Sequence, residues 1–198
     1  VSKEVGQLFP LLGSLSKNHA KVIWFANGGH ERFVLQAPEP VDGRFHTAPG
    51  MFSAAHADPG STFLIENLPP DIKGRIADFC AGWGYLSVEV AARYPSVRGI
   101  ALYEAHHASL QAARENMAKL APHIEATFHW QDLVCEKATG NYDTIIMNPP
   151  FHQGRAAEPS IGMSIIRNAH GALHKGGRLY LVANRTLPYE ATLETTFY

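Results

Sequence analysis

From Arg75 onward, short apolar runs alternate with longer segments of helical periodicity, and this alternation limits the possible folds more than any other feature. The runs are rich in β-branched residues and have the length of strands, whereas the segments between them have the length of helices. We expect strands at 76–80, 97–103, 126–130, 144–147 and 178–183, and helices at 86–94, 107–120 and 160–173. Such an order predicts an α/β fold with an open, mostly parallel sheet and helices on its faces.

The first 40 residues do not continue this alternation. Apolar residues between Ser2 and Ser16 recur at close to helical spacing, but Pro10 interrupts them, so we expect at most a kinked or two-part helix. Further expected features are a strand at 22–25, a turn at 27–30 and a linker at 37–40. The sequence therefore predicts a small N-terminal appendage at 1–40 and a main domain at 41–198.

Residues 44–69, which precede the alternation, contain local signals for a strand, a loop and a helix. We expect one strand of a small hairpin at 44–47 and a loop at 49–53. Asp58 is a candidate helix N-cap, because Pro59 follows it and proline is favoured in the first helical turn. The helix should end at Pro69. The apolar residues expected on its inner face are Phe63, Leu64 and Leu68.

Composition narrows the class of protein. The 198 residues are 45% hydrophobic and carry 17 Lys and Arg against 18 Asp and Glu, so the net charge of -1 provides no overall basic field for nucleic acid. Cys80 and Cys135 are too few for a disulfide framework and are typical of a reducing, cytoplasmic compartment. We expect no signal peptide and no membrane helix, which needs a run of about 20 apolar residues. The 11 histidines show no metal-ligand spacing, so we expect no metal site.

A glycine-containing turn follows the first strand of the alternation, with the sequence Asp78-Phe-Cys-Ala-Gly-Trp-Gly84. Glycine lets the backbone turn sharply into a helix and approach a ligand closely. A dinucleotide-binding turn would have a third glycine where Ser87 stands, and a P-loop would have a lysine that this turn lacks. The turn therefore favours a nucleoside ligand without a pyrophosphate; a tight turn that binds no ligand is the alternative.

Acidic residues end the next two expected strands. Glu104 closes the second, where a carboxylate can accept hydrogen bonds from both hydroxyls of a ribose. Asp132 closes the third, where it can accept from an adenine amine, with Leu133 and Trp130 as apolar cover. Each acid alone is more often a helix cap or a solvated surface group. Together with Asp78 they form a row along the edge at which the parallel strands end.

Asn148-Pro-Pro-Phe151 follows the fourth strand and completes this row. The prolines favour extended conformations at Asn148 and Pro149 and remove two N–H donors. The Asn148 side-chain oxygen and the Pro149 carbonyl can then accept the two protons of a planar amine, while Phe151 stacks on the ring that carries it. A strand that simply ends in an Asn-Pro turn is the alternative.

With these motifs, the chain resembles the class I S-adenosylmethionine-dependent methyltransferases of the Asn-Pro-Pro-(Phe/Tyr) type. More narrowly, it is similar to the bacterial ribosomal RNA guanine-N2 methyltransferases, namely the small-subunit enzyme and its large-subunit relatives. The resemblance covers about residues 40 to 198. The segments that carry the narrower resemblance are 49–53, 58–61, 148–152 with Gly154, 182–184 and 187–189.

The resemblance implies a Rossmann-like class I methyltransferase fold, S-adenosyl-L-methionine as the cofactor, and ribosomal RNA or a ribosomal subunit as the partner. The implied reaction is methyl transfer to an exocyclic amine, with N2 of a guanine favoured. Adenine in nucleic acid and a protein glutamine are alternatives, because the Asn-Pro-Pro turn serves all these acceptors. A catalytically inactive RNA-docking module is the alternative from a different class of protein.

The resemblance also implies roles for individual residues. The implied catalytic residues are Asn148, Pro149, Pro150 and Phe151. The implied cofactor-binding residues are Asp78, Phe79, Cys80, Ala81, Gly82, Gly84, Glu104, Ala105, Asp132, Leu133 and Asn148. The implied substrate-binding residues are Phe52, His152, Arg155, Asn184 and Arg185, of which the arginines can contact phosphates.

Three features depart from the family pattern. Cys80 stands at the usual first glycine of the cofactor loop, so the backbone there must do without the conformational freedom of glycine. Ala54 replaces a basic residue, and the chain ends at Tyr198, where the family continues into two further strands, so C-terminal strands are expected to be missing. By the same resemblance, residues 1–40 are similar to the tail of a degenerate methyltransferase-like domain.

Overall fold

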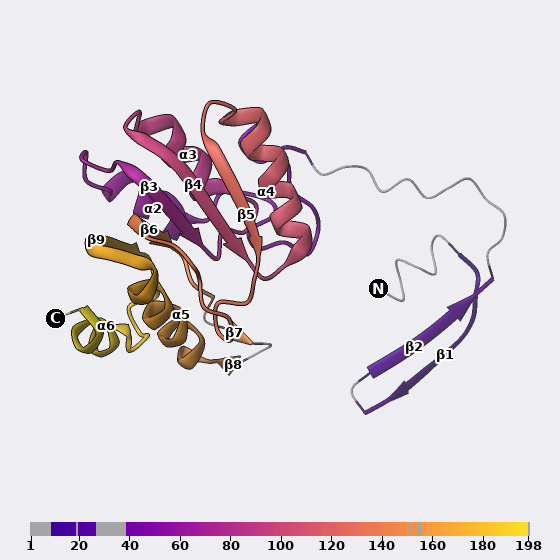
Figure 1. Ribbon diagram of the computed structural model, residues 1–198. Helices are drawn as coiled ribbons and strands as arrows, with labels where there is room; N and C mark the ends of the chain where they lie inside the picture. Colours follow the sequence, from indigo (N-terminus) through magenta and orange to yellow (C-terminus); the bar gives the residue numbers. More distant parts are fainter. Residues whose placement is uncertain (1–8, 19, 27–38, 151, 154–155, 198) are drawn as a thin grey trace. The chain divides into compact units, whose positions relative to one another are not determined.

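The computed structural model describes residues 9–18, 20–26, 39–150, 152–153 and 156–197. The chain divides into two compact units, Val1–Gln36 and Ala37–Tyr198, each with its own sheet (Figure 1).

The first unit contains an antiparallel hairpin of β1 (Leu11–Lys17) and β2 (Ala20–Phe25), in which Leu15 lies opposite Val22. The strand expected at 22–25 is confirmed, but the helix expected between Ser2 and Ser16 is wrong over its described part. Pro10 cannot sit inside a helix, and a helix of the few remaining residues would be too short to be stable alone. Pairing with β2 instead gives the backbone of these residues its hydrogen-bond partners. The turn expected at 27–30 lies outside the described residues.

The second unit is built on a five-stranded sheet in the order β5-β4-β3-β6-β9. Every pairing in this sheet is parallel, which confirms the fold class expected from the alternation. Its strands are β3 (Gly74–Phe79), β4 (Val97–Glu104), β5 (Glu125–Trp130), β6 (Tyr142–Met147) and β9 (Leu173–Leu181). Parallel strands end at one edge, so the row of polar residues predicted after these strands is brought to that edge.

Helices cover both faces of this sheet (Figure 1). On one face lie α2 (Pro59–Asn67), α3 (Tyr85–Arg93) and α4 (His107–Leu120), and on the other lie α5 (Pro159–Ala172) and α6 (Tyr189–Phe197). Successive residues of β3 enter opposite cores: Ile76 packs with the α2, α3 and α4 side, and Ala77 packs with the α5 and α6 side. This alternation makes the strands apolar on both faces, as parallel strands between two helical layers must be.

The helices predicted at 86–94, 107–120 and 160–173 are confirmed to within one residue at each end, and the helix after Asp58 ends at Asn67. Several other local expectations are wrong. Phe63 is 63% exposed and does not face the core, although Leu64 and Leu68 do. The strand expected at 178–183 begins at Leu173, because the Gly176-Gly177 pair does not end the pairing. Gly176 has a φ of 84°, and a side chain on Gly177 would meet the Tyr142 carbonyl oxygen at 2.8 Å. The glycines therefore allow an irregular close approach to β6.

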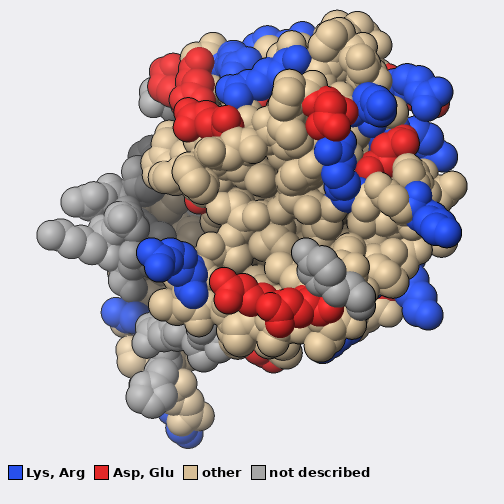
Figure 2. All heavy atoms as spheres, turned by 90° about the vertical axis from the view of Figure 1, so that its left-hand side faces the viewer, with Lys and Arg blue, Asp and Glu red and all other residues tan. Residues whose placement is uncertain are grey.

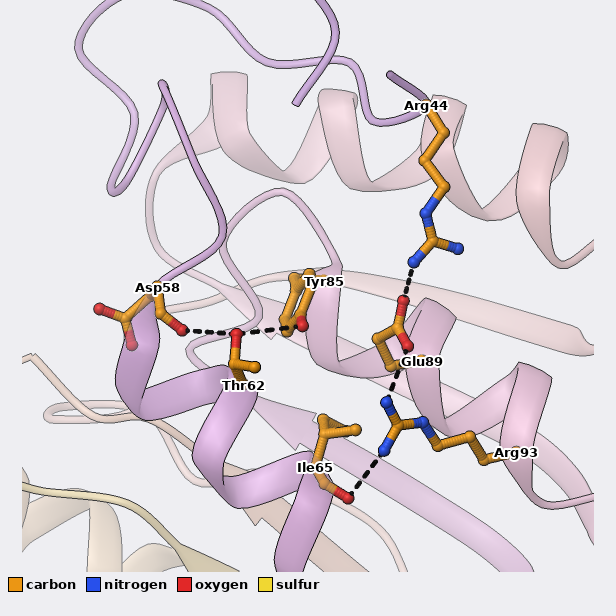
Figure 3. A network of polar contacts seen from close by, with 7 residues as sticks. All are labelled: Arg44, Asp58, Thr62, Ile65, Tyr85, Glu89 and Arg93. Carbon is orange, nitrogen blue, oxygen red and sulfur yellow. Dashed lines mark hydrogen bonds and ion pairs between the residues drawn. The ribbon is translucent and has the colours of Figure 1, made fainter. Parts of the chain in front are cut away.

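Residues 44–47 do not form the expected hairpin strand, because a tight turn closed by a single bridge between Val41 and Phe45 takes its place. A polar network joins this turn to two helices (Figure 3). Arg44 pairs with Glu89 of α3, which also faces Arg93, and Arg93 donates to the Ile65 carbonyl of α2 at 3.2 Å. The network fixes the turn against the helical layer without requiring a strand.

Asn116 of α4 connects two loops that lead to the functional edge. Its side chain is fully buried, accepts from the His46 N–H at 2.7 Å, and donates to the carbonyls of His46 at 2.9 Å and Trp83 at 2.8 Å. A buried amide that satisfies three backbone groups cannot be removed without leaving them unpaired. Asn116 therefore holds both the 45–48 segment and the glycine-containing turn against α4.

Among the described residues, no helix combines the length and the apolar character that a bilayer crossing would require.

Asn116→Ala should destabilise the fold by about 2–4 kcal/mol, because it leaves three buried backbone groups without partners. Asn67→Ala is the matched control, since the exposed Asn67 side chain makes one hydrogen bond, to the Phe63 carbonyl, and its loss should cost about 0.5 kcal/mol or less. Denaturant unfolding measures both values. Equal destabilisation by the two substitutions would contradict this role of Asn116.

Candidate functional site

A cleft of about 410 Å³ lies at the edge where β3, β4, β5 and β6 end. This volume falls within the range of about 300–1,000 Å³ that is typical of small-molecule sites. Its walls come from several loops and are lined by Gly50, Phe52, Cys80, Gly82, Tyr103, Glu104, Ala105, His106, Ser109, Gln131, Asp132, Leu133, Val134, Asn148, Pro149, Pro150 and Ile165. The structure therefore brings three of the four predicted strand-end residues, Glu104, Asp132 and Asn148, together around one hollow.

The turn after β3 forms the floor of this cleft and depends on left-handed backbone conformations. Cys80 has a φ of 61°, and Gly82 and Gly84 have φ values of 56° and 87°. The expectation that Cys80 must do without the freedom of glycine is confirmed, since few non-glycine residues adopt such angles. At Gly84 an added Cβ would meet the Cβ of Ala113 at 3.2 Å, so glycine also permits close packing on α4.

Glu104, at the end of β4, holds the glycine-containing turn. One carboxylate oxygen accepts from the Gly82 N–H at 2.8 Å, and the other accepts from the His106 N–H at 2.7 Å. An ionised carboxylate has about four lone-pair sites, so each oxygen can accept one more hydrogen bond from a ligand. Glu104 can thus bind a pair of hydroxyls without releasing the turn.

Asp132 follows β5 and closes a turn. Its carboxylate accepts from the Val134 N–H at 2.9 Å, and Asp132 and Leu133 both line the cleft. The expected contribution of Trp130 is wrong, because this side chain is 68% exposed and does not line the cleft. Its indole N–H donates to the Ala105 carbonyl at 2.9 Å, and its ring packs edge-on against His107. Trp130 therefore braces the outside of the wall.

Asn148, at the end of β6, lines both this cleft and a smaller cavity of about 40 Å³ beside the start of α2. Its side-chain nitrogen donates to Asp58 Oδ2 at 2.9 Å and to Ser61 Oγ at 3.0 Å. The sequence marked Asp58 as an N-cap, which is confirmed by its hydrogen bond to the Ser61 N–H, but did not predict its contact with Asn148. Pro149 and Pro150 complete this wall of the cleft.

Asp78 and Phe79 lie beneath the cleft and are fully buried, so they do not line it. Asp78 accepts from the Ser87 hydroxyl at 2.7 Å, but its other oxygen has no partner among the described residues. Burial raises the pKa of Asp78 to about 7, against the weaker opposite effect of the Ser87 hydrogen bond. Burial likewise raises the pKa of the Cys80 thiol, with smaller contributions from nearby carboxylates. A thiol held protonated in this way is a poor nucleophile.

The remaining predicted site residues are placed as follows. Ala81 lines the smaller cavity, and Gly84 supports the turn without lining the cleft. Phe52 lines the cleft, yet 60% of its surface is exposed at the rim. Asn184 and Arg185 are exposed and do not line the cleft; Asn184 accepts from the Thr186 N–H at 3.0 Å instead. Phe151, Arg155 and the His152 side chain lie outside the described part of the chain.

In the described part of the structure, no group of three or more His, Cys, Asp or Glu side chains is arranged to hold a metal ion.

Comparison with known proteins agrees with this geometry. The family model described as "Methyltransferase small domain" matches residues 42–198. The chain belongs to this methyltransferase family. The resemblance found in the sequence motifs is thereby confirmed. The five-stranded parallel sheet agrees with the fold that this resemblance implies.

Relatives within the family narrow the comparison. Ribosomal RNA small subunit methyltransferase C from Salmonella newport (strain SL254) is 36% identical over 158 residues, and the protein of that name from Escherichia coli (strain SMS-3-5 / SECEC) is 37% identical. Each alignment covers 79% of this chain and 45% of the relative, so the chain spans about half the length of these proteins. A solved structure of the T. thermophilus 16S rRNA N2 G1207 methyltransferase (RsmC), in complex with AdoMet and guanosine, is 29% identical, with a TM-score of 0.65. That match covers 80% of this chain and 44% of the solved chain.

The buried carboxyl of Asp78 should make stability depend on pH. Its pKa is about 7 in the folded protein, against about 3.9 for an unfolded chain. Between these values the folded protein retains a proton that the unfolded chain has lost, so the contribution of Asp78 to stability is greatest below pH 4 and declines as the pH rises to 7. Asp78→Asn should therefore gain stability relative to wild type between pH 5 and 8, by on the order of 1–4 kcal/mol.

Thermal and denaturant unfolding at several pH values measures this difference. Asp71→Asn is the control, because Asp71 is exposed and its hydrogen bond with Arg178 lowers its pKa, so it is ionised throughout this window. Parallel pH curves for wild type and Asp78→Asn would show that the Asp78 carboxyl is not protonated in the folded state.

Proposed function

We propose that this chain is an S-adenosyl-L-methionine-dependent N-methyltransferase whose acceptor is N2 of a guanine in small-subunit ribosomal RNA. The observation that carries the proposal is that Asn148 and its two prolines line the same cleft as Glu104 and Asp132. A wall suited to a nucleoside and a turn suited to an amine would thus face the same cleft. Membership of a methyltransferase family supports the same reaction class.

The residues around the cleft fit the proposed cofactor. Glu104 would accept from the two ribose hydroxyls through its remaining lone pairs, and Asp132 would accept from the adenine amine. Leu133 and Ala105 would supply apolar contact with the adenine ring. Gly82 leaves open space in front of the backbone, since an added Cβ there would meet nothing within 4 Å. When bound, the cofactor supplies a methyl group on a positively charged sulfur.

The chain's own residues would prepare the acceptor. An exocyclic amine is a weak nucleophile because its lone pair is delocalised into the ring. The Asn148 side-chain oxygen and the Pro149 carbonyl would accept hydrogen bonds from its two N–H groups, which moves the nitrogen toward tetrahedral geometry and aims its lone pair into the cleft. The amine proton becomes acidic once the nitrogen carries a fourth substituent, so this site needs no strong base.

Ribosomal RNA is the proposed source of the guanine because the relatives are named ribosomal RNA small subunit methyltransferase C, and the similar T. thermophilus structure contains guanosine. Arg155 and the exposed Arg185 would contact phosphates, and Phe151 would stack on the base. The net charge is -1, and Figure 2 shows acidic and basic side chains together on one face. Affinity for arbitrary RNA should therefore be weak and salt-dependent, so recognition would rest on the shape of a ribosomal particle. Such a substrate would place the protein in the cytoplasm.

Glu104→Ala should weaken binding of S-adenosylmethionine by about 1–3 kcal/mol, because the ribose hydroxyls lose a charged acceptor and the turn loses the bonds to Gly82 and His106. Glu104→Gln keeps one acceptor oxygen and should lose less. Glu66→Ala, which removes an exposed carboxylate from α2, should bind like wild type. Calorimetry on the full chain measures all three, and unchanged affinity in Glu104→Ala would argue against the proposed cofactor site.

Undermethylated small ribosomal subunits incubated with the full chain and labelled cofactor should acquire label in guanine, identified as the N2-methyl nucleoside by mass spectrometry. Free guanosine should be a poor acceptor. Asn148→Ala separates methyl transfer from cofactor binding. Turnover should fall by about 100-fold or more while cofactor affinity stays near wild type, since the lost Asn148 oxygen acts on the amine. Label in adenine or in protein, with none in guanine, would identify a different acceptor.

A further inference from the structure

A carboxylate outside the row of strand ends contacts the Asn148 side chain. Asp58 precedes α2 and lies 90 positions before Asn148 in the sequence. Its Oδ2 accepts from both the Ser61 N–H at 2.8 Å and the Asn148 side-chain nitrogen at 2.9 Å. Ser61 Oγ, which is buried, accepts from the same nitrogen at 3.0 Å. Both amide protons of Asn148 thus have an acceptor.

These partners determine which way the amide faces. The two ends of an asparagine amide have nearly the same shape, and their hydrogen-bond partners decide between the two orientations. An ionised carboxylate accepts hydrogen bonds and cannot donate them, so Asp58 requires the nitrogen of Asn148 on its side. The Asn148 oxygen is then directed away from Asp58, and Asn148 also lines the large cleft.

The acceptor atoms are themselves held in place. The Asp58 carbonyl accepts from the Thr62 N–H at 2.9 Å and from the Thr62 hydroxyl at 3.1 Å, which anchors the residue to the first turn of α2. Figure 3 shows the Asp58 carboxylate pointing away from Thr62, so these bonds leave it free for Asn148. Gly60 allows the approach, since an added Cβ would lie 3.0 Å from Asp58 Oδ2.

We propose that Asp58, with Ser61, is a positioning residue that locks the Asn148 amide with its oxygen available to the acceptor amine. The charge adds a second effect, because a charged acceptor on the amide nitrogen polarises the group and makes its oxygen a stronger acceptor. This inference rests on the proposed function, in which that oxygen accepts a hydrogen bond from the guanine amine. Asp58 acts through Asn148 and need not touch the nucleotide.

The two substitutions that separate this role from helix capping are Asp58→Ser and Asp58→Asn. Serine caps a helix about as well as aspartate but is too short to reach Asn148, so Asp58→Ser keeps the cap and removes the lock. Asparagine keeps an oxygen that can accept from both Ser61 and Asn148 but lacks the charge. The single-turnover rate should fall about 10- to 100-fold in Asp58→Ser and only a few-fold in Asp58→Asn. Ser61→Ala should lie between them.

The test uses the full chain with undermethylated small subunits and labelled cofactor in single-turnover assays, together with cofactor Kd by calorimetry and thermal unfolding. Asp58→Ser should keep wild-type Kd and unfolding temperature. In an Asn148→Ala background it should cause no further loss of rate, because the group it positions is gone. Thr62→Val removes the hydroxyl bond to the Asp58 carbonyl and keeps the backbone N–H bond that anchors Asp58, so it should keep the wild-type rate.

Nuclear magnetic resonance of the ¹⁵N-labelled chain gives a readout that does not depend on turnover. The side-chain amide signals of Asn148, assigned by their loss in Asn148→Ala, should shift in Asp58→Ser and Ser61→Ala and remain in place in Thr62→Val. Unmoved signals and a wild-type rate in Asp58→Ser overturn the inference. So does a rise in cofactor Kd that matches the loss of rate, which would mean that the carboxylate holds the cofactor. A wild-type chain that methylates no guanine refutes the proposed function instead, and the amide signals still report whether Asp58 holds Asn148.

Discussion

The parallel pairing of β3 with β4 on one side and β6 on the other is the interaction on which the rest of the structure depends. It aligns Asp78 with Leu102 and Ile146, so the three strands reach the functional edge in register. Because all these strands are buried on both faces, a slip of one residue would exchange the two cores. The same register that buries the apolar residues therefore sets the spacing of Cys80, Glu104 and Asn148 around the cleft.

Polar side chains then hold the turn that follows β3 in place. Glu104 holds the turn after β3 through the Gly82 N–H, and Asn116 holds the same turn through the Trp83 carbonyl. The first bond joins the end of β4 to the turn after β3, and the second joins that turn to α4, so the turn is held from two sides by the protein itself. Such bracing keeps a site shaped in the absence of ligand, which reduces the ordering cost of binding.

The sequence predicted the parallel sheet, the helices and the strand-end residues because these depend on local apolar periodicity and on a general property of parallel strands. It failed where one segment competes with another. Residues 11–16 have nearly helical spacing but pair with β2 once that strand is present. Trp130 ends a strand beside the cleft, yet its indole turns outward to a carbonyl of the neighbouring loop. Likewise, Asp58 carries a clear capping signal, and nothing local reveals that its second partner is Asn148.

The contact between Asp58 and Asn148 joins the beginning of the main domain to its fourth strand, across 90 residues of chain. Contacts of such long sequence separation form late in folding, because the closure of the intervening chain must come first. The methyl acceptor site would therefore be assembled only after β3, β4, β5 and β6 have paired and α2 has docked. A nascent chain that has not yet released its β6 segment from the ribosome has every residue of the wall proposed to bind ribose, but it lacks the turn proposed to bind the amine. Under the proposed function, methyl transfer would therefore begin only after the whole main domain has folded.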